Sequence, residues 1–456
     1  NSNDTSSSTD VVNLIGADWQ DTGVDTSVNG TGTYSIYQAS GNNVYVVISD
    51  AITPTITNVT QTITDTSGND ALYGSIAADD ITATDGNDTL YGQAGMDTLT
   101  GGNGSDDLYG GAGNDSIDAG DGDDEIYAGT GDDTIDGGAG YDELDYSTTN
   151  DDLTITYATT ANQGSVSGAT IGTDTYVGIE NVIGGTGNDT FVGSTSTDDS
   201  LSYASINGAV QVDFSGANVG TVNTVNAGVD TFTGMETIIG SNSNDTFNGV
   251  TGGVAVDGLG GGSDRLSYID SSAAVTITFA ADSDTSGTVT GNANATFINV
   301  EHVQGSTAAD VIDGSAISNN LSIYVLGSEG DDTITGGAGS ADALAYQAYT
   351  VDITADLTAG TVLSSVGNDT VSDIEEINTG SGNDDITGTV GNDIIRGNAG
   401  DDTFVGSAGN DTIEGGAGFD TLDFSAQSTD LSLTGLRFDY NNWTYISALG
   451  NDRFLS

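Results

Sequence analysis

Nine consecutive nonapeptides run from Asp65 to Asp145 in one frame without an insertion, and they read DTSGNDALY, GSIAADDIT, ATDGNDTLY, GQAGMDTLT, GGNGSDDLY, GGAGNDSID, AGDGDDEIY, AGTGDDTID and GGAGYDELD. The sixth place of every unit is Asp, and the eighth place is Leu or Ile. The fourth place is Gly in every unit but one, where Ala77 stands. An array of Gly-rich turns with regularly spaced carboxylates predicts both the fold and a need for cations.

Each place in the nonapeptide has its own physical role. Gly at the fourth place allows a positive φ and a close approach of the backbone to an ion, and Asp at the sixth place supplies hard oxygen ligands. The residues around the eighth-place hydrophobe suit a very short strand whose neighbouring side chains point outward. One coil consists of two turns and two strands and therefore takes two units. We expect Leu90 to stack on Leu108, and Leu99 to stack on Ile117 in the opposite sheet.

The units match the pattern GGxGxDxUx and therefore resemble the RTX family, whose secreted members form calcium-binding parallel β-rolls. The resemblance implies an all-β, right-handed parallel β-roll or β-solenoid. It also implies that the turn Asp side chains and the turn carbonyls of neighbouring coils hold Ca²⁺ between them. RTX proteins usually leave the cell by type I secretion, so an extracellular location is expected.

Further units follow the first block. Five consecutive nonapeptides occupy Thr379 to Asp423, and isolated units lie at 184–192, 240–248, 305–313 and 327–335. The pattern is broken at Ala77 and in the unit after Gly339, where we expect weak or absent sites. By resemblance, the predicted calcium ligands are Asp70, Asp88, Asp97, Asp106, Asp115, Asp124, Asp133, Asp142, Asp189, Asp245, Asp332, Asp384, Asp393, Asp402, Asp411 and Asp420.

A longer repeat lies over the nonapeptides. A Leu-x-aromatic element such as Leu144–Tyr146 begins it, an alternating strand follows, and an element such as Asp174–Glu180 closes it before an RTX-like unit reopens. We interpret the linkers as strands that continue the same stack in wider coils, with separate small domains as the alternative. The expected organisation is an N-terminal β segment (1–64), the first RTX block (65–145), irregular RTX-like solenoid units (146–378), a second block (379–423) and the start of a further β unit that stops before its closing element (424–456).

The charge of the chain points to the same ligand. There are 68 acidic residues against 4 basic ones, which gives a formal net charge of −64. A compact chain without metal would repel itself strongly, so we expect disorder in the absence of calcium. Calcium accepts many oxygen ligands in flexible geometry, whereas zinc and copper prefer Cys and His. The sequence has no Cys, and His302 is its only histidine.

Several function classes are disfavoured. Four arginines are too few for a nucleic-acid surface, and no apolar run reaches the roughly 18 residues that a membrane span needs. His302 lies alone on an alternating strand, and acidic pairs such as Glu375-Glu376 are better explained as calcium turns or solvated edges. We therefore expect no enzymatic activity in this chain. Aromatic residues such as Trp19 and Trp443 are expected in the core or at edges more readily than on a sugar-binding surface.

Two roles remain open. The first is a calcium-dependent extracellular structural or adhesive protein, such as a surface layer, a filament or a large adhesin segment. Calcium ions are its expected partners, and a homo-oligomer or filament and a cell-surface polysaccharide are further candidates. The alternative is the calcium-binding C-terminal module of a secreted hydrolase or toxin whose catalytic domain lies outside this chain. The long, irregular units favour the first role.

Overall fold

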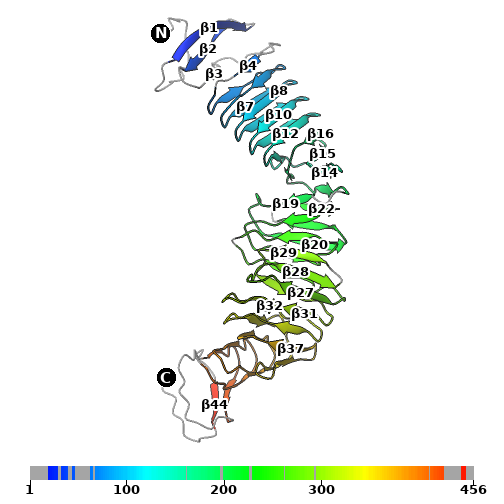
Figure 1. Cartoon of the computed structure of the whole chain (residues 1–456), viewed down its shortest axis with the longest axis vertical. Coiled ribbons are helices and arrows are strands. Elements are labelled where there is room, and N and C mark those ends of the chain that lie inside the picture. Colours follow the sequence, from blue (N-terminus) through cyan, green and yellow to red (C-terminus); the bar gives the residue numbers. More distant parts are fainter. Residues whose placement is uncertain are drawn as a thin grey trace. The chain divides into compact units, whose positions relative to one another are not determined.

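The structure is a computed structural model (Figure 1), and the part it describes is built from β-strands and turns, without a helix. It describes residues 62–64, 67–160, 162–195, 199–224, 228–260, 262–291, 294–409 and 411–425, and as backbone strands also 19–28, 32–39, 44–46 and 443–447. The all-β fold class is confirmed. Two compact units divide the chain: unit 1 holds residues 1–202 and 226–235, and unit 2 holds 203–225 and 236–456.

The N-terminal segment contains a small antiparallel sheet, in the order β1 (Trp19–Val28), β2 (Gly32–Ala39) and β3 (Val44–Val46). The N-terminal β segment expected at 1–64 therefore contains strands. At the other end, β44 (Trp443–Ser447) pairs in parallel with β43 (Asp420–Phe424). The rest of the expected C-terminal unit, 426–442 and 448–456, lies outside the described residues.

The first block of unit 1 is a parallel β-roll with two units per coil. Leu90 pairs with Leu108 in one sheet and Leu99 with Ile117 in the other, which confirms the predicted stacking. One sheet contains β4 (Thr62–Thr64), β6 (Asp80–Thr82), β8 (Thr98–Asn103), β10 (Ser116–Asp121) and β12 (Thr134–Ala139). The facing sheet contains β5 (Ala71–Tyr73), β7 (Thr89–Ala94), β9 (Asp107–Ala112), β11 (Glu125–Thr130), β13 (Glu143–Asp145) and β17 (Asn181–Ile183).

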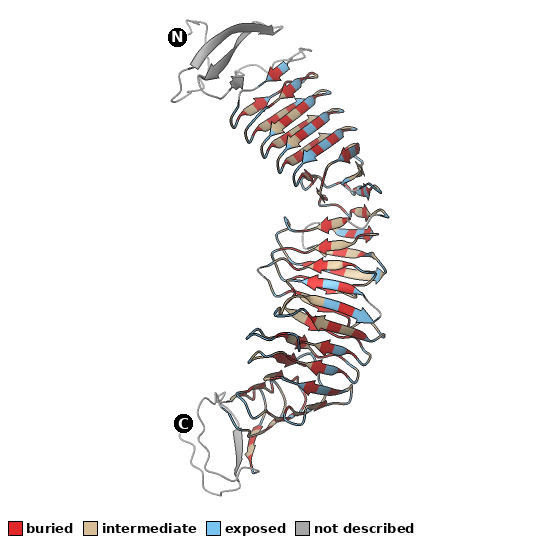
Figure 2. Cartoon of the chain, viewed as in Figure 1, coloured by how far each residue is buried: buried red, intermediate tan, exposed pale blue. Residues whose placement is uncertain are grey.

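Alternation along each short strand creates the core. Burial alternates residue by residue in Figure 2, and the eighth-place side chains are buried in every coil, as at Leu90, Leu108 and Ile126. Such stacks of Leu and Ile remove apolar surface from water and stabilise neighbouring coils against each other. The ninth-place side chains point outward, and Tyr73, Tyr91, Tyr109 and Tyr127 form one continuous stack with ring centroids 4.7, 4.7 and 4.5 Å apart.

Hairpins widen the coils in the linker of unit 1. The strands β14 (Thr154–Tyr157), β15 (Gln163–Gly168) and β16 (Gly172–Val177) pair antiparallel with one another. At its outer edges, β16 pairs in parallel with β12, and β14 pairs in parallel with β18 (Thr190–Val192). The linker strands therefore lie within the nonapeptide sheet. The remaining strands of unit 1 are β19 (Ser200–Ser202) and β22 (Val229–Thr233), and β22 pairs with β18.

Unit 2 repeats this arrangement with two long sheets. The first holds β20 (Val210–Gly216), β21 (Val219–Thr224), β24 (Thr246–Asn248), β26 (Arg265–Ser267), β30 (His302–Gln304), β32 (Tyr324–Leu326), β34 (Ala343–Ala345), β38 (Glu376–Asn378), β40 (Ile394–Arg396) and β42 (Thr412–Glu414). The second holds β23 (Thr237–Ile239), β25 (Ala255–Asp257), β27 (Val275–Phe279), β28 (Gly287–Gly291), β29 (Ala295–Ile298), β31 (Val311–Asp313), β33 (Thr333–Thr335), β35 (Thr354–Asp356), β36 (Thr361–Leu363), β37 (Asn368–Ser372), β39 (Asp385–Thr387), β41 (Thr403–Val405), β43 and β44. The described residues include no helix with the length and apolar character that a membrane span requires.

Candidate metal centre

The sixth-place aspartates of the first block form two columns, one along each row of turns. In each column the backbone N–H of one Asp donates to Oδ1 of the Asp one coil later, as from Asp106 to Asp124 at 2.8 Å and from Asp97 to Asp115 at 2.8 Å. Column A consists of Asp70, Asp88, Asp106, Asp124 and Asp142, and column B of Asp79, Asp97, Asp115 and Asp133. The repeat therefore places carboxylates directly above one another at the spacing of stacked strands.

These carboxylates are buried, and one oxygen of several of them is left without a donor. Asp97, Asp106 and Asp115 are 2%, 1% and 3% exposed. Within the described part of the chain, Oδ2 has no hydrogen-bond partner in Asp97, Asp106, Asp115, Asp124, Asp133 and Asp142. A buried carboxylate oxygen without a donor is costly, because it has lost its hydration and gained nothing in return. The columns thus require protons or cations.

Burial is the main cause of a large change in acidity. It raises the pKa of Asp97 to about 6, and that of Asp106 to about 7. The hydrogen bond donated by the backbone N–H of the preceding Asp lowers each pKa in part, and the negative charges of neighbouring aspartates in the same column raise it further. Because these groups would otherwise take up protons near neutral pH, a divalent cation that neutralises them stabilises the ionised, folded form.

The glycine at the first place brings a second oxygen close to Oδ2. Around the point that a Cβ on Gly92 would occupy, Oδ2 of Asp97 lies at 2.7 Å and the carbonyl oxygen of Gly110 at 2.4 Å. Around the equivalent point at Gly101, Oδ2 of Asp106 lies at 2.6 Å, and a carbonyl of the next coil at 2.4 Å. These two turns therefore gather carboxylate and carbonyl oxygens around a position that a side chain would occupy.

An all-oxygen donor set of this kind fits Ca²⁺, which takes six to eight oxygens from carboxylates, carbonyls and water. Among the described residues, no group of three or more His, Cys, Asp or Glu side chains is placed to hold a metal ion by itself. The turn carbonyls would therefore have to supply much of the coordination. Column members and the carbonyls beside them are the residues that would hold the ions.

The fourth-place glycine is required by the turn itself. Gly113 has a φ of 136°, and a Cβ there would lie 1.3 Å from the carbonyl oxygen of Gly95. No L-residue side chain fits this conformation and this approach. At this turn the carbonyls of successive coils can approach so closely only because the place carries Gly.

All the sequence-predicted ligands lie in such carboxylate stacks. The backbone N–H of Asp189 donates to Oδ1 of Asp230 at 2.9 Å, and that of Asp245 donates to Oδ1 of Asp264 at 2.7 Å. In the second block, Asp384 donates to Asp402 and Asp402 to Asp420, at 2.9 and 3.2 Å. Asp393 donates to Asp411, and Asp310 to Asp332. These bonds fix the positions of the carboxylates, while their metal binding stays a prediction.

Sequence reasoning missed the acids that continue the columns into the linkers. The N–H of Asp133 donates to Oδ1 of Asp174 at 2.9 Å, and that of Asp142 donates to Oε2 of Glu180 at 2.8 Å. The closing element of the longer repeat thus extends column B with its Asp and column A with its Glu. The missed signal was the spacing: both acids stand two residues before a buried hydrophobe, as the sixth place does before the eighth.

The same rule holds in unit 2. Asp369 accepts from the N–H of Asp332 at 3.0 Å, and Glu301 from that of Asp264 at 2.7 Å. Glu375 accepts from Asp342 at 3.2 Å. Each closing acid therefore takes the place of a sixth-place Asp in the next coil.

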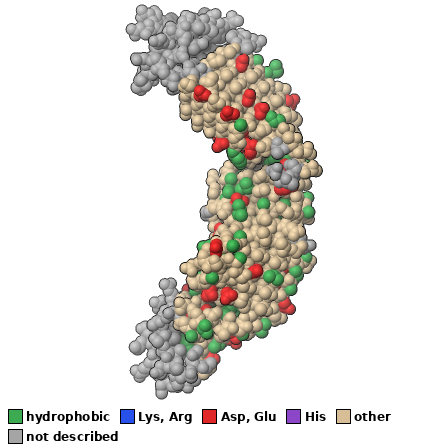
Figure 3. All heavy atoms as spheres, viewed as in Figure 1, with side chains coloured by type: hydrophobic (Ala, Val, Ile, Leu, Met, Phe, Trp, Pro, Cys, Tyr) green, Lys and Arg blue, Asp and Glu red, His purple; other side chains and the backbone are tan. Residues whose placement is uncertain are grey.

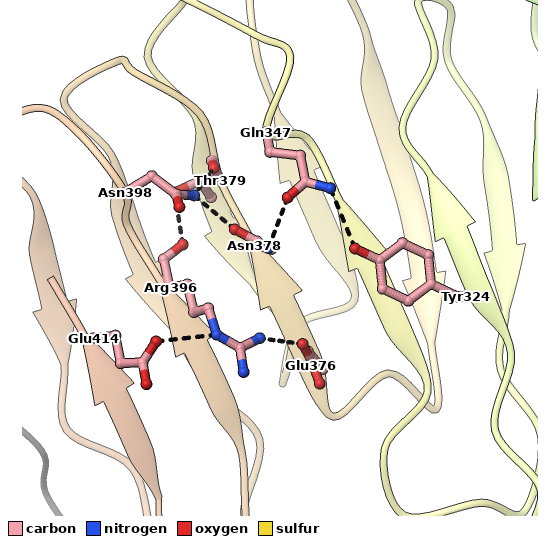
Figure 4. Close-up of polar contacts among 8 residues, drawn as sticks. All are labelled: Tyr324, Gln347, Glu376, Asn378, Thr379, Arg396, Asn398 and Glu414. Carbon is pink, nitrogen blue, oxygen red and sulfur yellow. Dashed lines mark hydrogen bonds and ion pairs between the residues drawn. The ribbon is translucent and has the colours of Figure 1, made fainter. Parts of the chain in front are cut away.

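In the described part of the chain, no arginine side chain forms an ion pair with a column carboxylate. Arg396 lies between Glu376 and Glu414, with 3.1 Å from its Nε to Oε2 of Glu414 (Figure 4). Arg265 donates to Ser267 and to Gln304. Acidic side chains are scattered over the face drawn in Figure 3. Compensation of the column charge by the protein's own described arginines is therefore excluded.

His302 is a half-buried strand residue. It lies on β30 beside Tyr324, with 4.4 Å between the ring centroids. Burial lowers the pKa of His302. This position fits a neutral side chain packed on the surface of the sheet.

Comparison with known proteins identifies the nonapeptide repeat. The model of the RTX calcium-binding nonapeptide repeat matches residues 60–90, 73–108, 82–117, 109–144, 174–199, 324–340, 378–413 and 387–422. No curated protein matches the sequence. Among solved structures, the extracellular lipase LipA from Serratia marcescens is similar at 16% identity and a TM-score of 0.14. That similarity covers 67% of this chain and 38% of the lipase chain, so the chain spans well under half the length of that protein.

Proposed function

Because this chain carries RTX calcium-binding nonapeptide repeats, we propose that it is an extracellular structural or adhesive protein that folds and assembles when it meets calcium outside the cell. RTX repeats bind calcium and are typical of secreted proteins. The assembling, adhesive role is the proposed part.

The observation that carries the proposal is the pair of columns with buried, donorless carboxylate oxygens in a chain of net charge −64. A ligand that binds only the folded chain contributes its binding free energy to folding. Calcium sites of modest affinity fill at the millimolar concentrations found outside cells. The chain would therefore stay unfolded during export and fold afterwards.

A scaffold role is supported by the uniformity of the described part. Both units consist of stacked short strands and turns, and stacked repeats of this kind form extended surfaces. Unit 1 also presents the stack of Tyr73, Tyr91, Tyr109 and Tyr127 on its outer surface, with Tyr73 42% exposed. Aromatic rings with an exposed edge and a hydroxyl suit contact with sugar rings or with another protein chain.

Sedimentation velocity in calcium, in magnesium and in chelator tests the proposal. We expect growth to large particles that requires calcium and increases with protein concentration. The double variant Tyr91→Ser and Tyr109→Ser tests whether the tyrosine stack contributes, with Tyr349→Ser in unit 2 as a control for loss of a tyrosine. A compact monomer at every concentration in calcium would contradict the assembling role and favour a calcium-binding module of a larger secreted hydrolase or toxin.

A further inference from the structure

The second place of the nonapeptide distinguishes two chemical classes among the turns. In the first class, the left-handed turns, the second residue has a positive φ and Oδ2 of the sixth-place Asp has no hydrogen-bond partner among the described residues. The class contains the turns of Asp97, Asp106, Asp115, Asp124, Asp133, Asp142, Asp402 and Asp420, and that of Asp264, which stands at the seventh place because its turn has one residue more. The turns of Asp189 and Asp384 belong to neither class, because Oδ2 has no hydrogen-bond partner there among the described residues although the second residues, Gly185 and Gly380, do not have a positive φ.

Left-handed turns form even where the second residue is not Gly. Gln93, Leu259 and Asn398 have φ values of 75°, 61° and 67°. A positive φ is unfavourable for such residues, above all for Leu. The conformation therefore reflects the turn rather than the freedom of a glycine, and it leaves the second-place amide without a bond to the carboxylate.

In the second class, the hydroxyl turns, Ser or Thr stands at the second place, and its φ is not positive. In six such turns this residue donates to the sixth-place carboxylate four positions later, whereas no such bond joins Thr84 to Asp88. Thr389 donates its N–H to Oδ2 of Asp393 at 2.8 Å and its hydroxyl to Oδ1 at 2.7 Å. The class contains the pairs Ser75–Asp79, Ser241–Asp245, Ser306–Asp310, Ser328–Asp332, Thr389–Asp393 and Ser407–Asp411.

The surroundings of Oδ2 can differ in the same way. At the first-place glycine of several left-handed turns, the Cβ position is bordered by Oδ2 and by a carbonyl oxygen of the next coil, as it is at Gly92 by Oδ2 of Asp97 and the Gly110 carbonyl. Gly74, in the hydroxyl turn of Asp79, is bordered in the same way. In the hydroxyl turns a hydroxyl can take that place: beside Gly305, Oδ2 of Asp310 and Oγ of Ser328 lie 2.3 and 2.6 Å from the point that a Cβ would occupy. One class thus gathers acceptors without donors, and the other supplies its own donors.

We propose that the second-place residue decides which turns bind calcium: left-handed turns hold an ion, and hydroxyl turns use Ser or Thr donors in place of one. The inference rests on the proposed calcium-dependent folding. It removes Asp245, Asp332, Asp393 and Asp411 from the set of ligands that the nonapeptide pattern predicts. Calcium would then be concentrated in the first block, with hydroxyl turns stabilising much of unit 2.

A matched pair of isosteric substitutions in the full chain separates the classes. Asp115→Asn changes a left-handed turn, and Asp310→Asn changes a hydroxyl turn. Bound calcium per chain is measured by native mass spectrometry and by metal analysis after dialysis, and far-UV circular dichroism in saturating calcium confirms the fold. We expect Asp115→Asn to lose at least one ion and Asp310→Asn to keep the wild-type number. Equal losses from the two variants would overturn the inference.

Hydrogen exchange of the unaltered chain gives a second test, which does not depend on how the variants fold. On addition of chelator, we expect amides in 97–142 to lose protection well before amides in 306–335, where both sixth-place carboxylates lie in hydroxyl turns. Simultaneous loss in the two segments would contradict the inference. If the wild-type chain binds no calcium at all, the proposed function fails, whereas calcium binding with equal losses in the two variants refutes only the division of the turns.

Discussion

Replacement of Gly113 by Ala tests the turn geometry most sharply. Gly113 has a φ of 136°, and an added Cβ would lie 1.3 Å from the carbonyl oxygen of Gly95 and 2.5 Å from its carbonyl carbon. Both obstructing atoms belong to the backbone of the preceding coil, so no side-chain rotation relieves the overlap. The two coils must separate locally.

The expected cost follows from what the separation breaks. A non-glycine residue held in such a conformation costs about 1–3 kcal/mol. Opening the turn also weakens two hydrogen bonds, from Gly113 N–H to the Thr130 carbonyl at 2.7 Å and from Gly95 N–H to the Ala112 carbonyl at 2.8 Å. Each contributes a net stabilisation of about 0.5–1.5 kcal/mol. The free energy of unfolding should therefore fall by about 2–6 kcal/mol. Calcium affinity should fall with it, because the same carbonyls border the column.

Urea unfolding in saturating calcium measures the effect, with Gly216→Ala as the matched control. No atom lies within 4 Å of the Cβ position at Gly216, and its φ is not positive, so Ala there should be neutral or stabilising by up to about 1 kcal/mol. Because a stacked array can unfold in parts, hydrogen exchange around residues 95–130 should accompany the curves. Equal unfolding midpoints and equal local protection in the two variants would refute the account of the fourth-place glycine.

Three further outcomes are expected. Leu108→Ala, at a side chain with 0% exposure, should lower the free energy of unfolding by about 2–5 kcal/mol in urea unfolding, and a loss below about 1 kcal/mol would contradict close stacking. Arg396→Gln, at a half-buried contact with Glu376 and Glu414, should cost no more than about 1 kcal/mol in the same assay, and a larger loss would show that the pair does more than link surface charges. In chelator, acidification from pH 8 towards pH 5 should increase the β signal in circular dichroism. The folded-state pKa values of Asp97 and Asp106, about 6 and about 7, lie above the unfolded value near 3.9, so their contribution to stability is largest below about pH 4 and is lost as pH rises through 6–7; a β signal that falls on acidification would contradict this.

The strict nonapeptide frame explains how much of the fold could be predicted from the sequence. Because side chains in a strand alternate and two units complete a coil, the spacing alone determines that Leu90 lies beside Leu108 and Leu99 beside Ile117. The linkers carry no such frame. In the linker of unit 1, β14, β15 and β16 pair antiparallel within the sheet. The alternating pattern indicated strands there, but it could not give their pairing.

The candidate site was predictable in position but not in chemistry. The sixth-place spacing located the columns, and the same Asp-x-hydrophobe rule, applied to the linkers, would have located Asp174 and, with Glu in place of Asp, Glu180. Which carboxylates receive donors depends on the backbone at the second place. A positive φ at Gln93 or Leu259 cannot be read from residue types that rarely adopt it, so the division between left-handed and hydroxyl turns emerged only from the structure.

Far-UV circular dichroism of the chelator-treated chain, recorded at pH 8 while calcium is titrated against a magnesium control, tests the central claim most directly. The buried columns predict a disordered spectrum without calcium and a cooperative rise of β signal with it. Magnesium should have little effect, because it requires a small octahedral site and gives up its water reluctantly. A full β spectrum in chelator, unchanged by calcium, would contradict the claim that calcium holds the folded columns together.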